Sequence, residues 1–452
     1  MIGFHAFGAP ILLVNDLDLA KQIFIKDFDH FLDRRQFKVD HEYLDNMMTQ
    51  LTGDAWKEMR SAVSPVFTSG KLKNMSKIIG KVAKDLVAHL ELVSATGEEV
   101  NARDLSSKFI MQSIASSGFG IETNAFEDSP QSVQFRKMAR KLTRAETGKL
   151  DGLKILFAFL FPSLNKITKF EVMDMVSLEF FANIIKQTLE TRKDQQQKRN
   201  DMVDLLTETL MGEAERNEQV AREIEEELEI AKPPRATAFE KDKMESVLIA
   251  NLLLLFFAGG ETSSGMMAAC ICCLANNPDV QTRLLEEINE ADYNEQMDYN
   301  TIMSMEYLDM VVNETMRHYP LAGEIERVCT KDYTIPGTNF TVPKGMLVQI
   351  CTSGIMMDER YYSNPTEFNP ENFSPKNKEK RNPYAFLVFG LGPRNCIGNR
   401  LALLQFKTGI VHMVRNFNIV ATSRTPKELE VDPKSLNNDV KGGIWICFEK
   451  RT

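Results

Sequence analysis

The sequence predicts a mainly α-helical protein with a small β portion, and three observations support this fold class. Apolar residues recur with helical spacing through most of the chain before Pro320, most strongly in the very apolar stretch 243–275. After Pro320 the pattern changes, because 332–350 alternates apolar and polar residues between turn signals. No segment has the composition of a linker, so residues 1–452 are expected to form a single domain.

The helical periodicity predicts a series of helices, several of which end at proline or asparagine breaks. Lys232-Pro233-Pro234 stops a charged helix, Asn276-Asn277-Pro278 separates two apolar ones, and Pro320 ends another. The predicted helices span 17–24, 75–94, 104–118, 174–198, 203–230, 243–275, 279–289, 301–318 and 397–415.

The β portion is predicted in two places. Turn signals at Pro336-Gly337 and Pro343-Lys344-Gly345 divide 332–350 into small hairpins. Residues 440–449 are expected to form a final strand pair around Gly442-Gly443. Between 356 and 395 there is little periodicity and much proline, asparagine and glycine, which indicates loops.

Charge and cysteine content narrow the function classes. The formal net charge is −9 and no basic face is indicated, so nucleic acid is not expected as a partner. The seven cysteines are odd in number and show no disulfide framework, which favours a reducing environment. Cys270, Cys272 and Cys273 lie in an apolar helical stretch without a nearby histidine, so we interpret them as small buried hydrophobes rather than zinc or redox residues.

One cysteine stands apart from the others. Cys396 lies between a glycine-rich loop and the start of a predicted helix, where unpaired N–H groups and a partial positive charge favour a thiolate. Gly392 and Gly398 allow the backbone to approach a flat ligand, and Arg394 can pair with a buried anion. The alternative is an ordinary loop cysteine.

The pattern Phe389-x-x-Gly392-x-Arg394-x-Cys396-x-Gly398 resembles the haem-binding signature of the cytochrome P-450 family. The resemblance implies the family fold, with haem b held between helix 243–275 and the Cys396 loop. It implies that Cys396 is the axial ligand of the haem iron, and that Phe389, Arg394 and Gly398 bind the cofactor beside it. Thiolate ligation donates electron density to iron and favours O–O cleavage.

The segment FFAGGETSS, 256–264, resembles the family's motif on the oxygen side of the haem. Two adjacent glycines inside a helix cost roughly 1 kcal/mol each relative to alanine, and helix packing would account for one of them but not for the whole set. The resemblance implies that Gly259 borders the haem and gives room for dioxygen. It also implies that Thr262 and Glu261 deliver protons to dioxygen.

Two further segments resemble the family's supporting network. Glu314 and Arg317 are three residues apart on one predicted helix, within YLDMVVNETMRHYP. Such a pair is by default a surface ion pair worth ~0–1 kcal/mol, but the segment matches the family nearly throughout. In FNPENF, Asn372 replaces the arginine that usually joins this network, so we expect a weakened network that has lost a third charge but keeps a hydrogen bond.

Three residues are candidates for binding the haem propionates. Trp56 and Arg60 are four apart on one helix face and both can donate to carboxylates. Arg327 lies where the family usually has another basic propionate ligand. The alternative for Trp56 and Arg60 is a packing tryptophan beside a surface arginine.

The resemblance covers the chain from its start to GGIWICFEKR and is strongest to the animal microsomal branch. It implies a monooxygenase that acts on lipophilic small molecules, with electrons from NADPH through a reductase and with cytochrome b5 as a second partner. Lys57, Arg400 and Lys407 are candidate reductase contacts. Two alternatives remain: a haem-binding carrier without turnover, and a peroxide isomerase or dehydratase, whose family members tend to lack the acid–threonine pair.

The location implied by the resemblance is the cytoplasmic face of the endoplasmic reticulum membrane. The longest apolar run, Val247–Ala258, is shorter than the ~20 residues of a spanning helix. The first residues resemble the part of that branch which comes after its membrane anchor, hinge and first strand. We therefore expect a truncated sequence rather than a divergent soluble form. Leu153–Leu164 is expected to be a core helix end or a membrane-surface contact.

Overall fold

The computed structural model describes residues 1–6, 8–143, 173–196, 198–211, 239–291, 297–432 and 439–451. The predicted contact of Leu153–Leu164 and the charged stretch after Met211 lie outside these residues. The helices are α1 (Leu17–Lys21), α2 (Gly53–Val63), α3 (Ser69–Thr96), α4 (Ala102–Ile114), α5 (Pro130–Thr143), α8 (Met175–Gln195), α9 (Met202–Met211), α11 (Met244–Asn276), α12 (Pro278–Ala291), α13 (Tyr299–Ser304), α14 (Glu306–His318), α15 (Thr352–Met356), α16 (Pro375–Lys380) and α17 (Asn399–Asn416).

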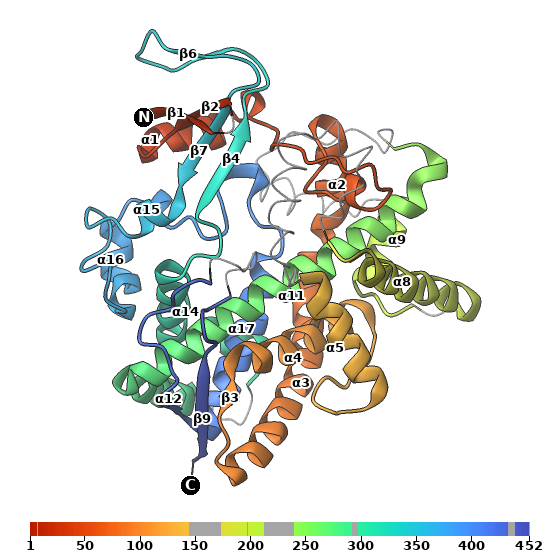
Figure 1. The fold of residues 1–452 in the computed structure, drawn as a ribbon, viewed down its shortest axis with the longest axis vertical. Helices are drawn as coiled ribbons and strands as arrows, with labels where there is room; N and C mark the ends of the chain where they lie inside the picture. The colour runs from red at the N-terminus through yellow and green to blue at the C-terminus, as the bar shows by residue number, and fades with distance from the viewer. Residues whose placement is uncertain are drawn as a thin grey trace.

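A mixed sheet lies at one end of the molecule and contains the first residues of the chain (Figure 1). Its strands follow the order β1 (Ile2–Ala6), β2 (Ala9–Leu13), β7 (Leu347–Cys351) and β4 (Glu324–Val328). β2 pairs parallel to β7, and β7 pairs antiparallel to β4. The sequence did not indicate β1 and β2, because Ile11 of β2 pairs with Leu347 of β7, far away along the chain.

The predicted hairpins between 332 and 350 are confirmed in part. β5 (Tyr333–Thr334) and β6 (Thr341–Val342) form a short antiparallel hairpin, whereas β7 leaves it to join the larger sheet. The predicted strand pair around Gly442-Gly443 was wrong. The two glycines have φ of 80° and 78° and lead into a single strand, β9 (Trp445–Lys450), whose partners are β8 (Phe417–Ala421) and β3 (Val100–Asn101).

The predicted helix 301–318 is two helices, α13 and α14, separated by an extended Met305. The cause is a cap that comes from another helix. The carboxylate of Glu287 in α12 accepts hydrogen bonds from the backbone N–H groups of Tyr307 and Leu308, at 2.7 and 2.8 Å. These are the N–H groups that a helix start leaves unpaired, so a distant side chain determines where α14 begins.

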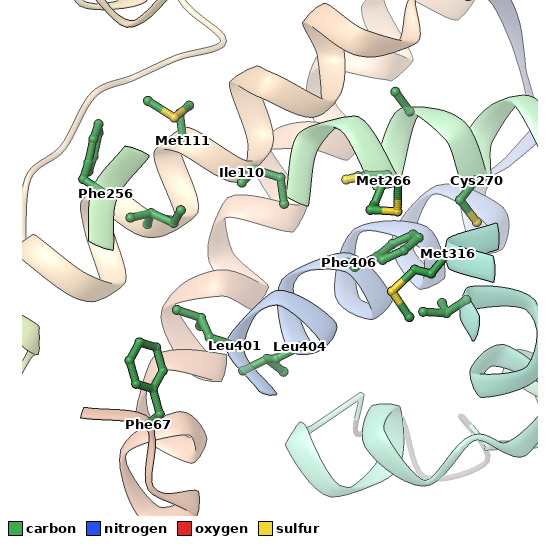
Figure 2. Close-up of a cluster of buried hydrophobic side chains, with 14 of the residues drawn as sticks. Phe67, Ile110, Met111, Phe256, Met266, Cys270, Met316, Leu401, Leu404 and Phe406 are labelled. Carbon is green, nitrogen blue, oxygen red and sulfur yellow. The ribbon is translucent and has the colours of Figure 1, made fainter. Parts of the chain in front are cut away.

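The long helix α11 runs diagonally through the middle of the molecule and organises the core (Figure 1). It packs against α4 on one side and α17 on another. Phe406 of α17 lies among Met266 of α11, Met316 of α14 and their neighbours in a buried cluster (Figure 2). By length and composition α11 could cross a membrane, but most of its side chains are buried inside the protein, as expected for a core helix.

Candidate active site

The Cys396 loop is a tight turn that ends at the start of α17. The backbone N–H of Cys396 donates to the carbonyl of Phe389 at 2.7 Å, and that of Asn395 donates to the carbonyl of Gly392 at 2.9 Å. Gly392 has a φ of +70°, and a Cβ atom there would collide with the carbonyl oxygen of Phe24. Glycine is therefore required at this position for the loop to dock against the π-helical turn Gln22–Lys26.

Cys396 has a different environment from the other cysteines. Cys270, Cys272, Cys273 and Cys329 are buried, whereas the Cys396 side chain is accessible to solvent. Protein atoms nevertheless surround the sulfur closely, and this desolvation raises the pKa of the thiol. The N–H groups of Gly398 and Asn399 and the charges of Arg60 and Arg34 act in the opposite direction, because they favour a thiolate.

One face of α11 is accessible although the helix crosses the centre of the protein. Ala258 and Thr262, one turn apart, are exposed, whereas Phe256, Gly260 and Ser263 are buried. The Thr262 hydroxyl donates to the carbonyl of Ala258 at 2.7 Å. An accessible strip inside a core helix indicates room for a ligand along this face.

Both adjacent glycines of α11 face α4, and Gly260 makes the closer approach. A Cβ at Gly259 would lie 3.1 Å from Cδ1 of Ile114, and one at Gly260 would collide with the sulfur of Met111. Both contacts are with α4. Packing against α4 therefore opposes a side chain strongly at Gly260 but only mildly at Gly259, where the end of the Ile114 side chain would have to shift by a few tenths of an ångström.

Glu261 is held by an arginine that sequence reasoning missed. Arg103, at the start of α4, forms an ion pair with the Glu261 carboxylate and donates to Ser264 and to the Glu261 carbonyl. Arg103 also lies 3.3 Å from the Asp439 carboxylate, so two acids share one guanidinium. Nothing in the local sequence indicates this pair, because Arg103 and Glu261 are 158 residues apart.

The Trp56–Arg60 face of α2 meets the Cys396 loop directly. Both side chains are buried, and Arg60 donates to the backbone and side-chain oxygens of Asn395 at 2.8 and 2.7 Å. Trp56 packs against Arg394, whose guanidinium lies 4.1 Å from the ring centroid. Arg60 is therefore not the surface arginine of the alternative interpretation.

Arg394 is anchored by backbone oxygens as well as by Trp56. It donates to the carbonyls of Leu32 and Leu51 at 2.7 and 2.9 Å and lies 3.4 Å from the Asp33 carboxylate. Burial, together with the neighbouring charge of Arg34, lowers the pKa of Arg394 to about 9.

Arg327 and Arg34 complete a cluster of four arginines around the loop. Arg327 is fully buried and donates to the carbonyls of Glu326 and Leu391 at 2.8 and 3.2 Å, but its Nε has no hydrogen-bond partner within the part of the chain that the structure describes. Burial, then the charges of Arg34 and Arg394, hold the pKa of Arg327 well below its ordinary value. Arg34 donates to the carbonyl of Arg394 at 2.9 Å, and sequence reasoning missed it.

This arginine cluster, Arg34, Arg60, Arg327 and Arg394, fits a ligand with acidic groups. Buried charges are costly unless they are paired. In the described ranges, Asp33 is the only carboxylate within 4.0 Å of Arg34, Arg327 or Arg394. A ligand with two carboxylates, such as haem with its propionates, would supply the missing negative charge. The donor set therefore agrees with a flat, dianionic group beside Cys396.

The Glu314–Arg317 pair is buried rather than a surface pair. Both side chains are fully buried and form two parallel hydrogen bonds of 2.7 and 2.8 Å. Arg317 also donates to the carbonyls of Met356 and Pro365. The amide of Asn372 donates to Glu314 at 3.1 Å, so this position keeps a hydrogen bond to the network.

A further arginine, Arg381, lies beside this network. Arg381 donates to the carbonyl of Asn372 at 2.7 Å and stacks on Tyr362 and Phe373, each ring centroid at 4.5 Å. Its charge interacts with that of Glu314. Arg381 therefore brings a positive charge near Glu314, but no ion pair joins the two among the described residues, and Asn372 itself is neutral as expected.

Three residues were predicted to contact the reductase, and for Lys407 this prediction was wrong. Its side chain is 2% exposed and lies 3.0 Å from the Asp309 carboxylate, so it cannot contact a partner. Lys57 is partly exposed, 4.0 Å from Asp54. Arg400 is partly exposed and donates to the hydroxyl of Ser69.

Comparison with known proteins agrees with this geometry. The model of the cytochrome P450 family matches residues 1–444. The chain is 35% identical to "Cytochrome P450 9e2" of Blattella germanica, over 100% of this chain and 85% of that protein. It is 34% identical to "Probable cytochrome P450 9f2" of Drosophila melanogaster, over 98% and 85%, and 33% identical to "Cytochrome P450 6B2" of Helicoverpa armigera, over 100% and 85%. The chain therefore belongs to the cytochrome P450 family, whose members are haem-thiolate monooxygenases.

Proposed function

We propose that residues 1–452 form one domain that binds haem b through Cys396 and inserts one atom of dioxygen into lipophilic small molecules. NADPH, through a reductase, supplies the two electrons, and the second oxygen atom leaves as water. The observation that carries the proposal is the accessible Cys396 sulfur beside the arginine cluster. The accessible face of α11 supports an apolar substrate, since half-buried Leu254, Leu255 and Phe257 flank Ala258.

The bound haem would supply the iron centre at which dioxygen is activated. Cys396 would ligate it, while the N–H groups of Gly398 and Asn399 moderate the charge on the sulfur. Trp56 and the arginine cluster would hold the propionates. Phe389 fixes the turn by accepting the Cys396 N–H, and Gly398 lies next to the Phe67 ring. Gly259 would border the haem only through its backbone, because its missing Cβ points to α4.

Proton delivery would involve Thr262 and Glu261. The Thr262 hydroxyl lies on the accessible face of α11 and can turn from the Ala258 carbonyl toward a ligand. Glu261 would exchange protons with solvent, and Arg103 would act as a positioning residue that orients its carboxylate. Because Arg103 also binds Asp439, it can stay paired while Glu261 moves.

The network of Glu314, Arg317 and Asn372 would hold the Cys396 loop in place. Two contacts connect residues beside the network to the segment that leads to the loop. Phe373, next to Asn372, packs on Phe386 with ring centroids 5.0 Å apart, and Tyr362 donates to the carbonyl of Ala385 at 3.2 Å. Phe386 begins the segment that ends in Cys396, so a rigid network would fix the position of the sulfur.

Partners and location follow from the resemblance to the microsomal branch. We place Lys57 and Arg400 among the contacts to the reductase, with cytochrome b5 as an alternative electron donor. The endoplasmic reticulum membrane is the proposed location. Separation of cell membranes from the soluble fraction, with detection of this chain in each, tests that location.

A carbon monoxide difference spectrum of the reduced protein tests the ligation. Wild type should show the red-shifted Soret band of thiolate-ligated haem, and Cys396→Ser should lose it. A haem-loaded wild type without that band would contradict the proposal. Incubation with reductase and NADPH then separates a monooxygenase from a carrier without turnover, and turnover of an organic hydroperoxide without reductase would instead indicate the isomerase or dehydratase class.

A further inference from the structure

A pocket whose lining includes no residue of the Cys396 loop is rich in positively charged side chains. It has a volume of about 620 Å³ and lies between α3, α4 and α5 with β9 at one side. Its lining includes five lysine or arginine side chains, Lys108, Arg136, Lys137, Arg140 and Lys141, against two acidic ones, Glu99 and Asp104. The whole chain has a net charge of −9, so this concentration of cations is unusual for the protein. We call it the α4–α5 pocket.

The acidic groups around the α4–α5 pocket are already engaged. Asp104 pairs with Arg140 at 2.9 Å, and Glu99 pairs with Arg424, outside the lining, at 2.9 Å. Asp128 pairs with Arg136 at 2.7 Å. Among the described residues, no carboxylate lies within 4.0 Å of Lys108, Lys137 or Lys141. Within the described ranges, Lys108 and Lys137 therefore have no ion-pair partner, whereas Lys141 interacts electrostatically with Asp174.

Two of the basic groups are crowded and partly desolvated. Lys108 is half-buried, and its pKa is lowered by burial first and then by the charge of Arg136. The pKa of His89 is lowered by burial and by Lys108. Asp128 and Asp104 act in the opposite direction on Lys108 but do not reverse the shift. An anion in the pocket would relieve this repulsion.

We propose that the α4–α5 pocket binds a phosphate monoester attached to an organic or lipid group. A phosphate monoester carries close to two negative charges at neutral pH and matches several ammonium and guanidinium donors at once. Leu105, Val133 and the Trp445 ring form an apolar wall for the organic part. Neither Cys396 nor Thr262 nor any member of the arginine cluster lines this pocket, so the site is separate from the one that would hold haem.

The test is calorimetric titration of the haem-loaded protein with inorganic phosphate and with phenyl phosphate, at constant ionic strength. The pocket variant carries Lys108→Gln and Lys137→Gln. The matched control carries Lys376→Gln and Lys380→Gln, two exposed lysines of α16, and so has the same change in net charge. Co-sedimentation with phosphatidylcholine vesicles, with and without phosphatidic acid, tests whether the phosphate belongs to a lipid. Thermal unfolding confirms that all variants are folded.

We expect saturable binding of phenyl phosphate, tighter than that of inorganic phosphate, and at least about a tenfold loss of affinity in the pocket variant but not in the control. Binding only to vesicles with phosphatidic acid, with the same dependence on Lys108 and Lys137, would assign the site to a lipid headgroup. Absence of both kinds of binding, or equal loss in the pocket variant and the control, would overturn the proposal.

Discussion

Two glutamate–arginine pairs of this protein differ in almost every physical respect. Glu314 and Arg317 belong to one helix, are fully buried and are joined by two parallel hydrogen bonds. Glu261 and Arg103 come from two helices, remain partly accessible, and share the arginine with Asp439. A buried, fully satisfied pair cannot move without leaving a charge unpaired, whereas a shared pair at an accessible site can exchange partners. The first pair suits a scaffold and the second suits a proton-handling site.

The largest effect is expected from breaking the buried pair. Arg317→Ala leaves the Glu314 carboxylate without its main partner, which should destabilise the fold by about 3–5 kcal/mol and abolish haem binding. Urea unfolding and the carbon monoxide spectrum measure the two effects. Glu371→Gln, which removes an exposed pair with Arg283, is the control and should cost ~0–1 kcal/mol. Equal losses in both variants would contradict the scaffold interpretation.

A smaller effect is expected at the periphery of the same scaffold. Arg381→Ala removes the hydrogen bond to the Asn372 carbonyl and the stacking on Tyr362 and Phe373. The expected loss is about 1–2 kcal/mol of unfolding free energy, with slower or less complete haem incorporation. Arg360→Ala, whose arginine is exposed and pairs with Asp358, should leave haem content unchanged. Full haem retention in Arg381→Ala would show that Asn372 alone suffices.

The accessible pair should respond in function more than in stability. In Arg103→Gln the Glu261 carboxylate loses its cation, so proton delivery would become less efficient and less product would form per NADPH consumed. We expect a roughly tenfold lower coupling ratio, with a loss of unfolding free energy smaller than that of Arg317→Ala. Arg103→Lys should restore part of the coupling. A variant that loses stability but couples normally would assign Arg103 a structural role only.

The smallest effect is expected in how the free energy of unfolding depends on pH, through His318 beside the buried pair. Burial and the charge of Arg317 lower the pKa of His318 from its ordinary value of 6.5. The unfolded chain therefore binds a proton at a higher pH than the folded one, so stability falls as the pH drops below about 6.5. His318→Gln should flatten this part of the stability profile, as measured by urea unfolding between pH 7 and pH 5. An unchanged slope would show that other groups dominate.

The sequence predicted much of the helical part of the fold, because amphipathic periodicity and proline breaks are local signals. The bounds of α11 and α17 agree with the predicted ranges within one or two residues. The prediction from sequence failed where a residue outside the segment decides its secondary structure. Glu287 splits 301–318 into two helices, and β7 pairs with β2 at the start of the chain.

The candidate site divides in the same way. The residues of the Cys396 loop could be selected because the loop is one continuous segment whose glycines and cysteine follow a fixed spacing. Three arginines could not be selected in this way: Arg34, Arg103 and Arg381. Each lies outside the recognised motifs and contacts a residue of another segment. Lys407 was wrongly expected to contact the reductase, because its position in the sequence does not reveal that it lies on the buried face of α17, next to Asp309 of α14.

By itself the sequence determined the family and the class of chemistry, and it singled out Cys396 as the predicted ligand of iron, because these depend on short segments with strong backbone requirements. The tertiary structure decided which charges surround that residue and which arginine holds Glu261. It also decided that Gly260 packs closely against Met111 of α4. Electrostatics and packing act between groups that are close in space, and folding brings such groups together from positions hundreds of residues apart.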